Sequence, residues 1–286
     1  MKGFLLGLVM VAATAVAYGN APEMRHGEVR IKTGVRLHYV EQGDPNGPPI
    51  ILLHGYSDSW VSYTRVLPLI DPKYHIYIPD QRGHGESDRP ASGYTFPDFA
   101  GDVIAFMDAK GLKRATIVGH SMGSFVAQHV ATMAPHRVEK LVLVGSAPAV
   151  SNGEVNQLRL EVGALGDPVP LKFVRDFQYS VVSRPVPDEF MDRVIKESMK
   201  LPARVWRDAM AGMLAQNSTV TLSKITAPTL IIWGDRETVF PKRSDQDALR
   251  NAIPNATLKV YAGTGHCPNW EEPSRFVTDL EDFMQT

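Results

Sequence analysis

One serine stands in a pattern that makes the residue a nucleophile. Ser121 is the centre of the Gly-His-Ser-Met-Gly sequence at residues 119–123, between an apolar run at 115–118 and a helical stretch that starts at Met122. A strand, a sharp turn and a helix in this order present a serine hydroxyl for attack. The turn strains its central residue, and glycines on both sides avoid collisions with the neighbouring strand and helix. Such a serine carries out acyl transfer.

A serine hydroxyl needs a histidine as its base, and the histidine needs a carboxylate that fixes its tautomer. In this topology the chain order is serine, acid, histidine. His266 is the candidate base, because it follows the last predicted strand within a Gly-Thr-Gly-His-Cys-Pro segment at residues 263–268. Structural roles are expected for the other candidates, which lie in tight turns or on the wrong side of the acid: His54, His84, His120 and His129.

Two carboxylates compete for the third position. Asp235 and Glu237 both lie in residues 233–241, directly after a buried apolar run. A turn in which Asp235 accepts hydrogen bonds from the loop backbone would account for that residue. The residues themselves leave both carboxylates open as the acid.

The reaction also needs donors for the oxyanion, normally the amide after the nucleophile and one amide from an early loop. Met122 supplies the first donor. The second is expected from Tyr56, which follows a His-Gly turn after the apolar run at residues 50–53. Each such donor contributes about 3 kcal/mol to comparable reactions.

Apolar segments alternate with amphipathic ones along most of the chain. Strands are predicted at residues 26–31, 36–41, 50–53, 74–79, 115–118, 140–144, 229–233 and 257–261. The later runs are continuously apolar, which is typical of parallel strands buried on both faces. The fold class is therefore α/β, with a mostly parallel central sheet and helices on both faces.

Residues 148–223 interrupt this alternation with helical patterns and several prolines. They predict a helical cap inserted between two halves of a core, residues 21–147 and 224–286. Apolar side chains of the insertion are expected over the site, and Trp270 after the histidine joins them. The predicted pocket residues are Phe173, Phe177, Trp206, Met210 and Trp270.

Composition indicates which classes of ligand and cofactor the protein can bind. The chain has 286 residues, 44% of them apolar, and a net charge of −1 without long charged blocks, which argues against nucleic acid as a ligand. A small ester or lactone is expected instead. Cys267 is the only cysteine, so no internal disulfide can form. The histidines lack ligand-like spacing, and neither a metal nor another cofactor is expected.

The first residues are typical of a signal for export. Lys2 precedes an apolar run at residues 4–17, which is too short to span a bilayer as a helix, and small residues then offer an A-x-A cleavage site. Residues 1–20 are predicted to be a signal peptide. The mature protein is then expected in the periplasm or medium, without stable membrane insertion. The alternative is an uncleaved segment that tethers the protein to the membrane, or a wrong start codon. Without export the protein would be cytoplasmic.

Together these motifs resemble the α/β-hydrolase superfamily, and in particular its cap-bearing serine hydrolases, over roughly residue 29 to the C-terminus. The resemblance includes the Asp-Gln-Arg-Gly-His-Gly-Glu-Ser segment at residues 80–87 and the Trp-Glu-Glu-Pro segment at 270–273. It implies that Glu237 is the acid, since relatives place it three residues after a glycine and four before a proline, although aspartate is commoner there. It also implies a structural turn around Asp80.

The resemblance implies a reaction class as well. Epoxide hydrolases and haloalkane dehalogenases of this fold use an aspartate nucleophile, so Ser121 excludes both. A serine esterase or lactonase for small to medium apolar acyl compounds is the main hypothesis. The alternatives are a hydrolase of carbon–carbon bonds, a perhydrolase or haloperoxidase-like activity, and a ligand receptor that keeps the fold without rapid turnover.

Overall fold

The computed structural model describes residues 23–215 and 222–286. The predicted signal peptide and residues 216–221 of the predicted insertion therefore lie outside the described residues. The described parts contain one eight-stranded sheet with the order β1-β2-β4-β3-β5-β6-β7-β8. Its strands are β1 Arg25–Arg30, β2 Arg36–Gly43, β3 Pro49–Leu53, β4 His75–Pro79, β5 Ala115–His120, β6 Val138–Val144, β7 Thr229–Gly234 and β8 Ala256–Tyr261.

The sheet is mostly parallel, as predicted. Strands β3 to β8 run parallel to one another, whereas β2 pairs antiparallel with both β1 and β4. All eight predicted strands are confirmed, with ends that differ by two residues at most. The carboxyl ends of β5, β7 and β8 thus meet at one edge, where the loops that carry Ser121, Glu237 and His266 begin.

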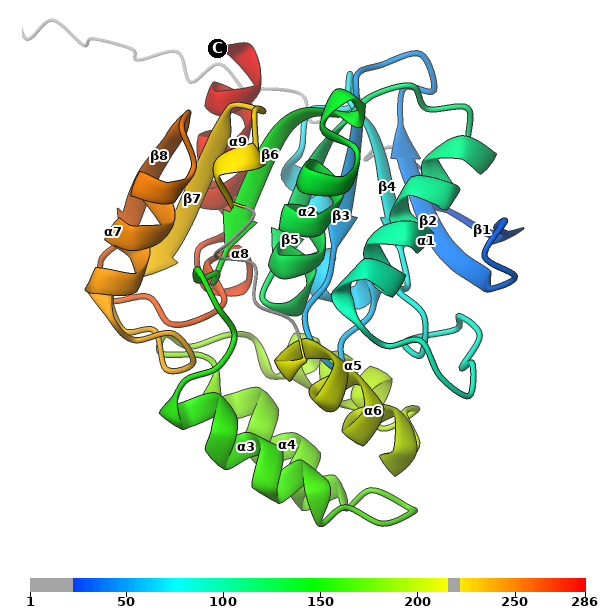
Figure 1. The fold of residues 1–286 in the computed structure, drawn as a ribbon, viewed down its shortest axis with the longest axis vertical. Helices are drawn as coiled ribbons and strands as arrows, with labels where there is room; N and C mark the ends of the chain where they lie inside the picture. The colour runs from blue at the N-terminus through cyan, green and yellow to red at the C-terminus, as the bar shows by residue number, and fades with distance from the viewer. Residues whose placement is uncertain (1–22, 216–221) are drawn as a thin grey trace, which may run out of the picture.

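Helices cover both faces of the sheet (Figure 1). Helices α1 (Phe96–Ala109), α2 (Met122–Met133) and α7 (Arg243–Ala252) lie on one face, and α9 (Pro273–Gln285) lies on the other. Alternate strand residues serve the two layers: Ile51 and Ile117 pack in one apolar cluster, whereas Ile50 and Val118 pack in the other. This two-sided burial explains why these strands are continuously apolar in sequence.

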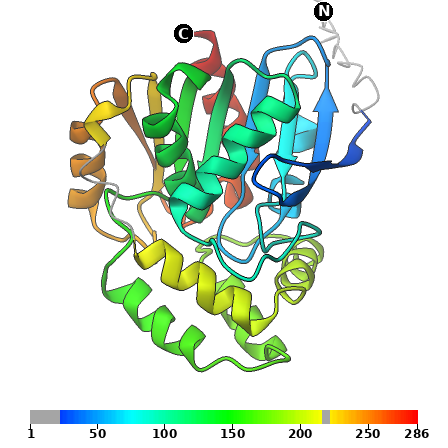
Figure 2. The same cartoon turned by 45° about the vertical axis from the view of Figure 1, so that its right-hand side comes forward.

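In the described residues between β6 and β7, four α-helices lie beyond the carboxyl ends of the strands (Figures 1 and 2). They are α3 Gly153–Gly163, α4 Leu171–Ser180, α5 Asp188–Ser198 and α6 Ala203–Leu214, and they are called the helical insertion below. A short helix, α8 (Pro268–Glu271), precedes α9. Among residues 23–215 and 222–286, no helix is both long and apolar enough to cross a membrane.

Candidate active site

Ser121 occupies the strained turn between β5 and α2. Its φ is 52° and its ψ is −121°, in the left-handed half of the Ramachandran map that residues with a side chain rarely adopt. A Cβ on Gly119 would lie 2.2 Å from the carbonyl oxygen of Gly123, and one on Gly123 would lie 2.3 Å from that of Leu53. The turn therefore needs glycine on both sides of the serine, as its sequence suggested.

His266 lies in the loop between β8 and α8. Its backbone amide donates to Val181 of the insertion (3.0 Å), and its side chain is only 3% exposed. The ring packs against Gly145 at the end of β6, where a Cβ would come within 2.9 Å of both Cε1 and Nδ1. Gly145 also has a φ of 55°, so two independent constraints keep this position free of a side chain next to the imidazole.

The two competing carboxylates have separate partners. His266 Nδ1 donates to Glu237 Oε2 at 2.7 Å, and the Glu237 side chain is buried. The other oxygen of Glu237, Oε1, accepts the amides of Val239 (2.6 Å) and Phe240 (3.2 Å). Asp235 instead accepts the amide of Gly263 at 2.6 Å, which is the loop-fixing role described above. The structure thus pairs the histidine with Glu237.

The two predicted oxyanion donors lie at the ends of β3 and β5. Tyr56 and Met122 both line the cavity that contains Ser121 and His266. Met122 is the first residue of α2, where a helix leaves its amides without internal acceptors. Within the described residues, neither amide donates a hydrogen bond. The Tyr56 hydroxyl donates to the carbonyl oxygen of Trp206 at 2.6 Å and so ties this loop to α6.

One cavity is lined by Ser121 and His266 and extends beneath the helical insertion, with about 580 Å³ of empty space that includes room open to the solvent. Three of the predicted pocket residues, Phe177, Met210 and Trp270, lie in its wall. Contrary to the expectation, Phe173 and Trp206 do not. Trp206 is fully buried and packs edge-on against Tyr56 (centroids 5.2 Å apart) and Phe173 (5.5 Å), so these rings join the insertion to the core.

A profile of the α/β-hydrolase fold family matches residues 48–273, which is most of the chain. The chain belongs to the α/β-hydrolase family. Three relatives of this α/β-hydrolase illustrate its range. A non-heme chloroperoxidase from Streptomyces lividans is 29% identical over 277 residues, covering 91% of this chain and 100% of the relative. A solved esterase from a Rhodococcus species is 25% identical with a TM-score of 0.81, covering 91% of this chain and 98% of that one.

An enol-lactonase from Burkholderia xenovorans shares the fold as well, with a TM-score of 0.79 at 21% identity. Its alignment covers 91% of this chain and 100% of the lactonase. Proteins similar to this α/β-hydrolase are thus named as an esterase, an enol-lactonase and a chloroperoxidase. The first two names denote hydrolases.

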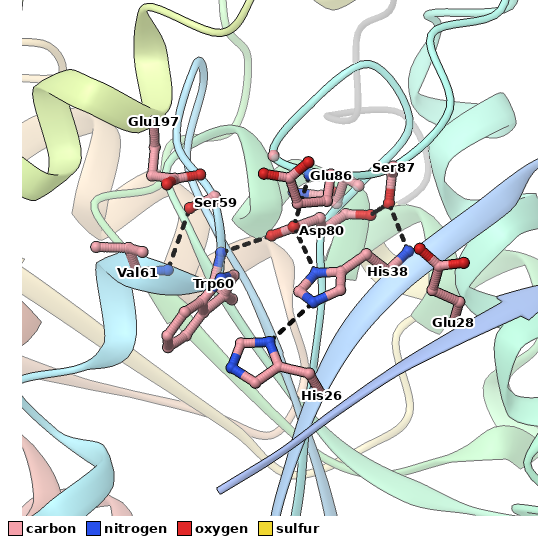
Figure 3. A network of polar contacts seen from close by, with 12 residues as sticks. His26, Glu28, His38, Ser59, Trp60, Val61, Asp80, Glu86, Ser87 and Glu197 are labelled. Carbon is pink, nitrogen blue, oxygen red and sulfur yellow. Dashed lines mark hydrogen bonds and ion pairs between the residues drawn. The ribbon is translucent and has the colours of Figure 1, made fainter.

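The segment at residues 80–87 of this α/β-hydrolase is a structural turn, as the resemblance implied (Figure 3). Asp80 is completely buried and accepts the amides of Trp60 (2.8 Å) and Glu86 (3.0 Å). It also accepts Nδ1 of His38 at 2.8 Å, and these partners hold the pKa of Asp80 below its usual range despite its burial. Asp80 therefore joins three segments of the chain, and it is not among the residues that line the cavity with Ser121.

The other buried histidines of this α/β-hydrolase have structural contacts. His54 accepts the amide of Gln81 at Nε2 (3.0 Å) and donates from Nδ1 to its neighbouring carbonyl. Burial lowers the pKa of His54, and it lowers the pKa of His84 to about 3. Both rings are therefore neutral at ordinary pH. His120 differs from them, because it lines the cavity.

Sequence reasoning missed two polar residues in the cavity wall, Asp58 and Gln178. Asp58 accepts Gln178 Nε2 at 3.0 Å, which links the Tyr56 loop to α4. Burial raises the pKa of Asp58 to about 7. A signal was present in the sequence, since a carboxylate two residues after Tyr56 stands in an otherwise uncharged segment, residues 50–64.

Glu271 is a further residue that holds the histidine loop of this α/β-hydrolase. Its carboxylate accepts the amides of Gly265 (3.0 Å), Ser183 (3.1 Å) and Arg184 (2.8 Å). It therefore joins the loop before His266 to the insertion. Among the described residues, no group of three or more His, Cys, Asp or Glu side chains is placed to hold a metal ion.

Proposed function

We propose that the protein is a serine hydrolase of carboxylic esters or lactones, with Ser121 as nucleophile, His266 as base and Glu237 as acid. One observation carries this proposal. His266 lines the cavity into which the strained Ser121 turn also opens, and a buried hydrogen bond of 2.7 Å joins its Nδ1 to Glu237. A general base held by a carboxylate next to a serine on a strained turn is the arrangement that acyl transfer requires.

The proposed reaction begins when Ser121 Oγ attacks the substrate carbonyl carbon and its proton passes to Nε2 of His266. The amides of Tyr56 and Met122 stabilise the negative charge that forms on the carbonyl oxygen. His266 then gives the proton to the leaving alcohol, and the acyl group stays on Ser121. Water attacks this ester after losing a proton to His266, and the acid product leaves as Ser121 regains the proton.

The cavity wall supports an apolar acyl group. Apolar side chains of the insertion and of the core beneath it dominate the wall: Phe125, Val155, Phe177, Met210, Met213 and Phe240. A lactone fits the same scheme, because its leaving alcohol is part of the same molecule.

The experiment is hydrolysis of p-nitrophenyl butyrate by wild type and by Ser121→Ala. The proposal predicts that the variant loses a factor on the order of 10⁶ in kcat, with an unchanged circular dichroism spectrum. Ser151→Ala is the matched control, because Ser151 is exposed at the start of the insertion, and it should keep wild-type activity. Ser121→Ala activity within tenfold of wild type would refute the assignment.

A second activity is supported by the 29% identity to a non-heme chloroperoxidase. Hydrogen peroxide in place of water would attack the proposed acyl-enzyme and release a peracid, with no new residue required. Release of peracetic acid from acetate esters in the presence of peroxide tests this reaction. It should require Ser121 to the same extent as ester hydrolysis does.

A further inference from the structure

The carboxyl group of Asp58 lies beside the proposed nucleophile. Asp58 is 3% exposed and lines the cavity, and its Oδ1 accepts Gln178 Nε2 at 3.0 Å. A Cβ placed on Gly55 would lie 2.9 Å from Asp58 Oδ2 and 3.3 Å from the Cβ of Ser121. Asp58 Oδ2 and Ser121 are thus near neighbours across a glycine, which leaves the space between them free of a side chain.

His120 presents a second polar atom at the same place. Its Nδ1 would lie 3.2 Å from the same Gly55 Cβ position, and the ring is 2% exposed. Nε2 pairs with the carbonyl oxygen of His266 at 3.1 Å, so Nε2 carries the proton. Burial holds the pKa of His120 well below its usual range, so the ring is neutral and Nδ1 is an acceptor. Among the described residues, Nδ1 has no hydrogen-bond partner.

The protonation state of Asp58 decides what it can offer a ligand. Burial raises the pKa of Asp58 to about 7, so below that pH the group is a neutral acid that donates a hydrogen bond. The titratable groups that interact with it are His266, Cys267 and Tyr63, and His120 lies beside the same Gly55 position. Cys267 in turn interacts with Glu237 and Glu271. Burial also raises the pKa values of Cys267 and Tyr63, so neither of them carries charge near neutral pH.

A donor and an acceptor therefore lie within 3.2 Å of the same point beside Gly55, next to Ser121. A hydroxyl group both accepts and donates, and it matches this pair. We propose that Asp58 and His120 form a subsite for a hydroxyl group of the substrate, which accepts from the Asp58 carboxyl group and donates to His120 Nδ1. The proposal rests on the proposed function and names its substrate class: hydroxy-substituted esters or lactones with the hydroxyl close to the reacting carbonyl.

The hydroxyl can belong to the acyl part or to the alcohol part of the ester, and matched probes distinguish the two. The acyl probe is p-nitrophenyl 3-hydroxybutyrate against p-nitrophenyl 3-methylbutyrate, in which a methyl group replaces the hydroxyl. The alcohol probe is 2-hydroxyethyl butyrate against propyl butyrate. At pH 6 we expect wild type to favour the hydroxylated member of one pair by about tenfold in kcat/KM, the effect of one good hydrogen bond. Equal rates in both pairs would overturn the proposal.

Variants separate this role from a structural one. Asp58→Leu removes the donor and should reduce the preference to about one. Asp58→Asn keeps a neutral donor of the same shape, and its amide oxygen can still accept from Gln178, so the preference should survive. The preference of wild type should also fall between pH 6 and pH 8, whereas that of Asp58→Asn should stay constant.

The control is Ser198→Ala, which removes another partner of Gln178 (2.9 Å) without touching the cavity. It should keep the preference. If Ser198→Ala loses it as Asp58→Leu does, the Asp58–Gln178 contact acts through the packing of the insertion and the subsite is refuted. Failure of the proposed function gives a different result, because Ser121→Ala would then still hydrolyse all four probes.

Discussion

Replacement of Glu237 by glutamine tests the mechanism most directly. The change keeps the size of the side chain and removes its charge. The glutamine oxygen can still accept the amides of Val239 and Phe240, which occupy Oε1 in wild type. Its NH₂ group then faces His266 Nδ1, where wild type has the acceptor Oε2 at 2.7 Å. Two donors cannot share one hydrogen bond, so Nδ1 must lose its proton.

The consequence is a wrong tautomer. With Nδ1 unprotonated, the neutral imidazole carries its proton on Nε2, the atom that must accept the proton of Ser121. In a comparable triad this error costs on the order of 10⁴ in kcat, or about 5 kcal/mol of barrier. We expect the same loss for Glu237→Gln, with KM changed by less than about threefold, because the side chain lies outside the cavity wall.

The assay is steady-state hydrolysis of p-nitrophenyl butyrate, with thermal unfolding to show that the variant is folded. Asp235→Asn is the matched control, since Asp235 is exposed and holds only the amide of Gly263. It should keep kcat within about threefold, a factor worth less than 1 kcal/mol. Should Asp235→Asn lose far more activity than Glu237→Gln, or should Glu237→Gln retain a tenth of the wild-type rate, the reasoning is refuted.

Two further predictions concern the surroundings of the site. Gly145→Ala places a Cβ 2.9 Å from the His266 ring at a φ of 55°, so we expect the base to be displaced and kcat on the same ester to fall about 100-fold. Gly101→Ala is the control, because a Cβ there meets open space beside α1, and it should keep wild-type activity. Equal rates for both variants would contradict the expectation. Asp58 has a raised pKa, so the native state binds its proton between about pH 4 and pH 7 and the unfolding free energy falls as pH rises through that range. Chemical denaturation at pH 5 and pH 8 should show that the unfolding free energy of Asp58→Asn, relative to that of wild type, is a few kcal/mol higher at pH 8 than at pH 5. The same difference between variant and wild type at both pH values would contradict this.

Much of the fold follows from local sequence. Ile50 to Leu53 and Leu141 to Val144 are continuously apolar because both faces of a parallel strand are buried, and this pattern can be recognised without any partner strand. The turn at Ser121 can be recognised too. Where a strand leads this sharply into a helix, a Cβ on either side of the serine would clash with backbone next to the turn, so glycine is required at both positions.

The pocket wall could not be predicted in the same way. Phe173, Phe177 and Trp206 are alike as apolar residues on helices, yet only Phe177 faces the cavity. The difference depends on how α4 and α6 rotate against the core. That rotation is set by contacts such as the Tyr56–Trp206 hydrogen bond, between residues 150 positions apart in the chain.

By itself, the sequence determined the α/β class and the turn at the serine, because both depend on neighbours within a few positions. Only the tertiary structure decided which carboxylate points at His266. Asp235 and Glu237 are two residues apart on one loop, and their directions depend on the β8–α8 loop packed against it. It also placed Asp58 and His120 beside the same position at Gly55, since packing between distant segments brings those polar atoms together.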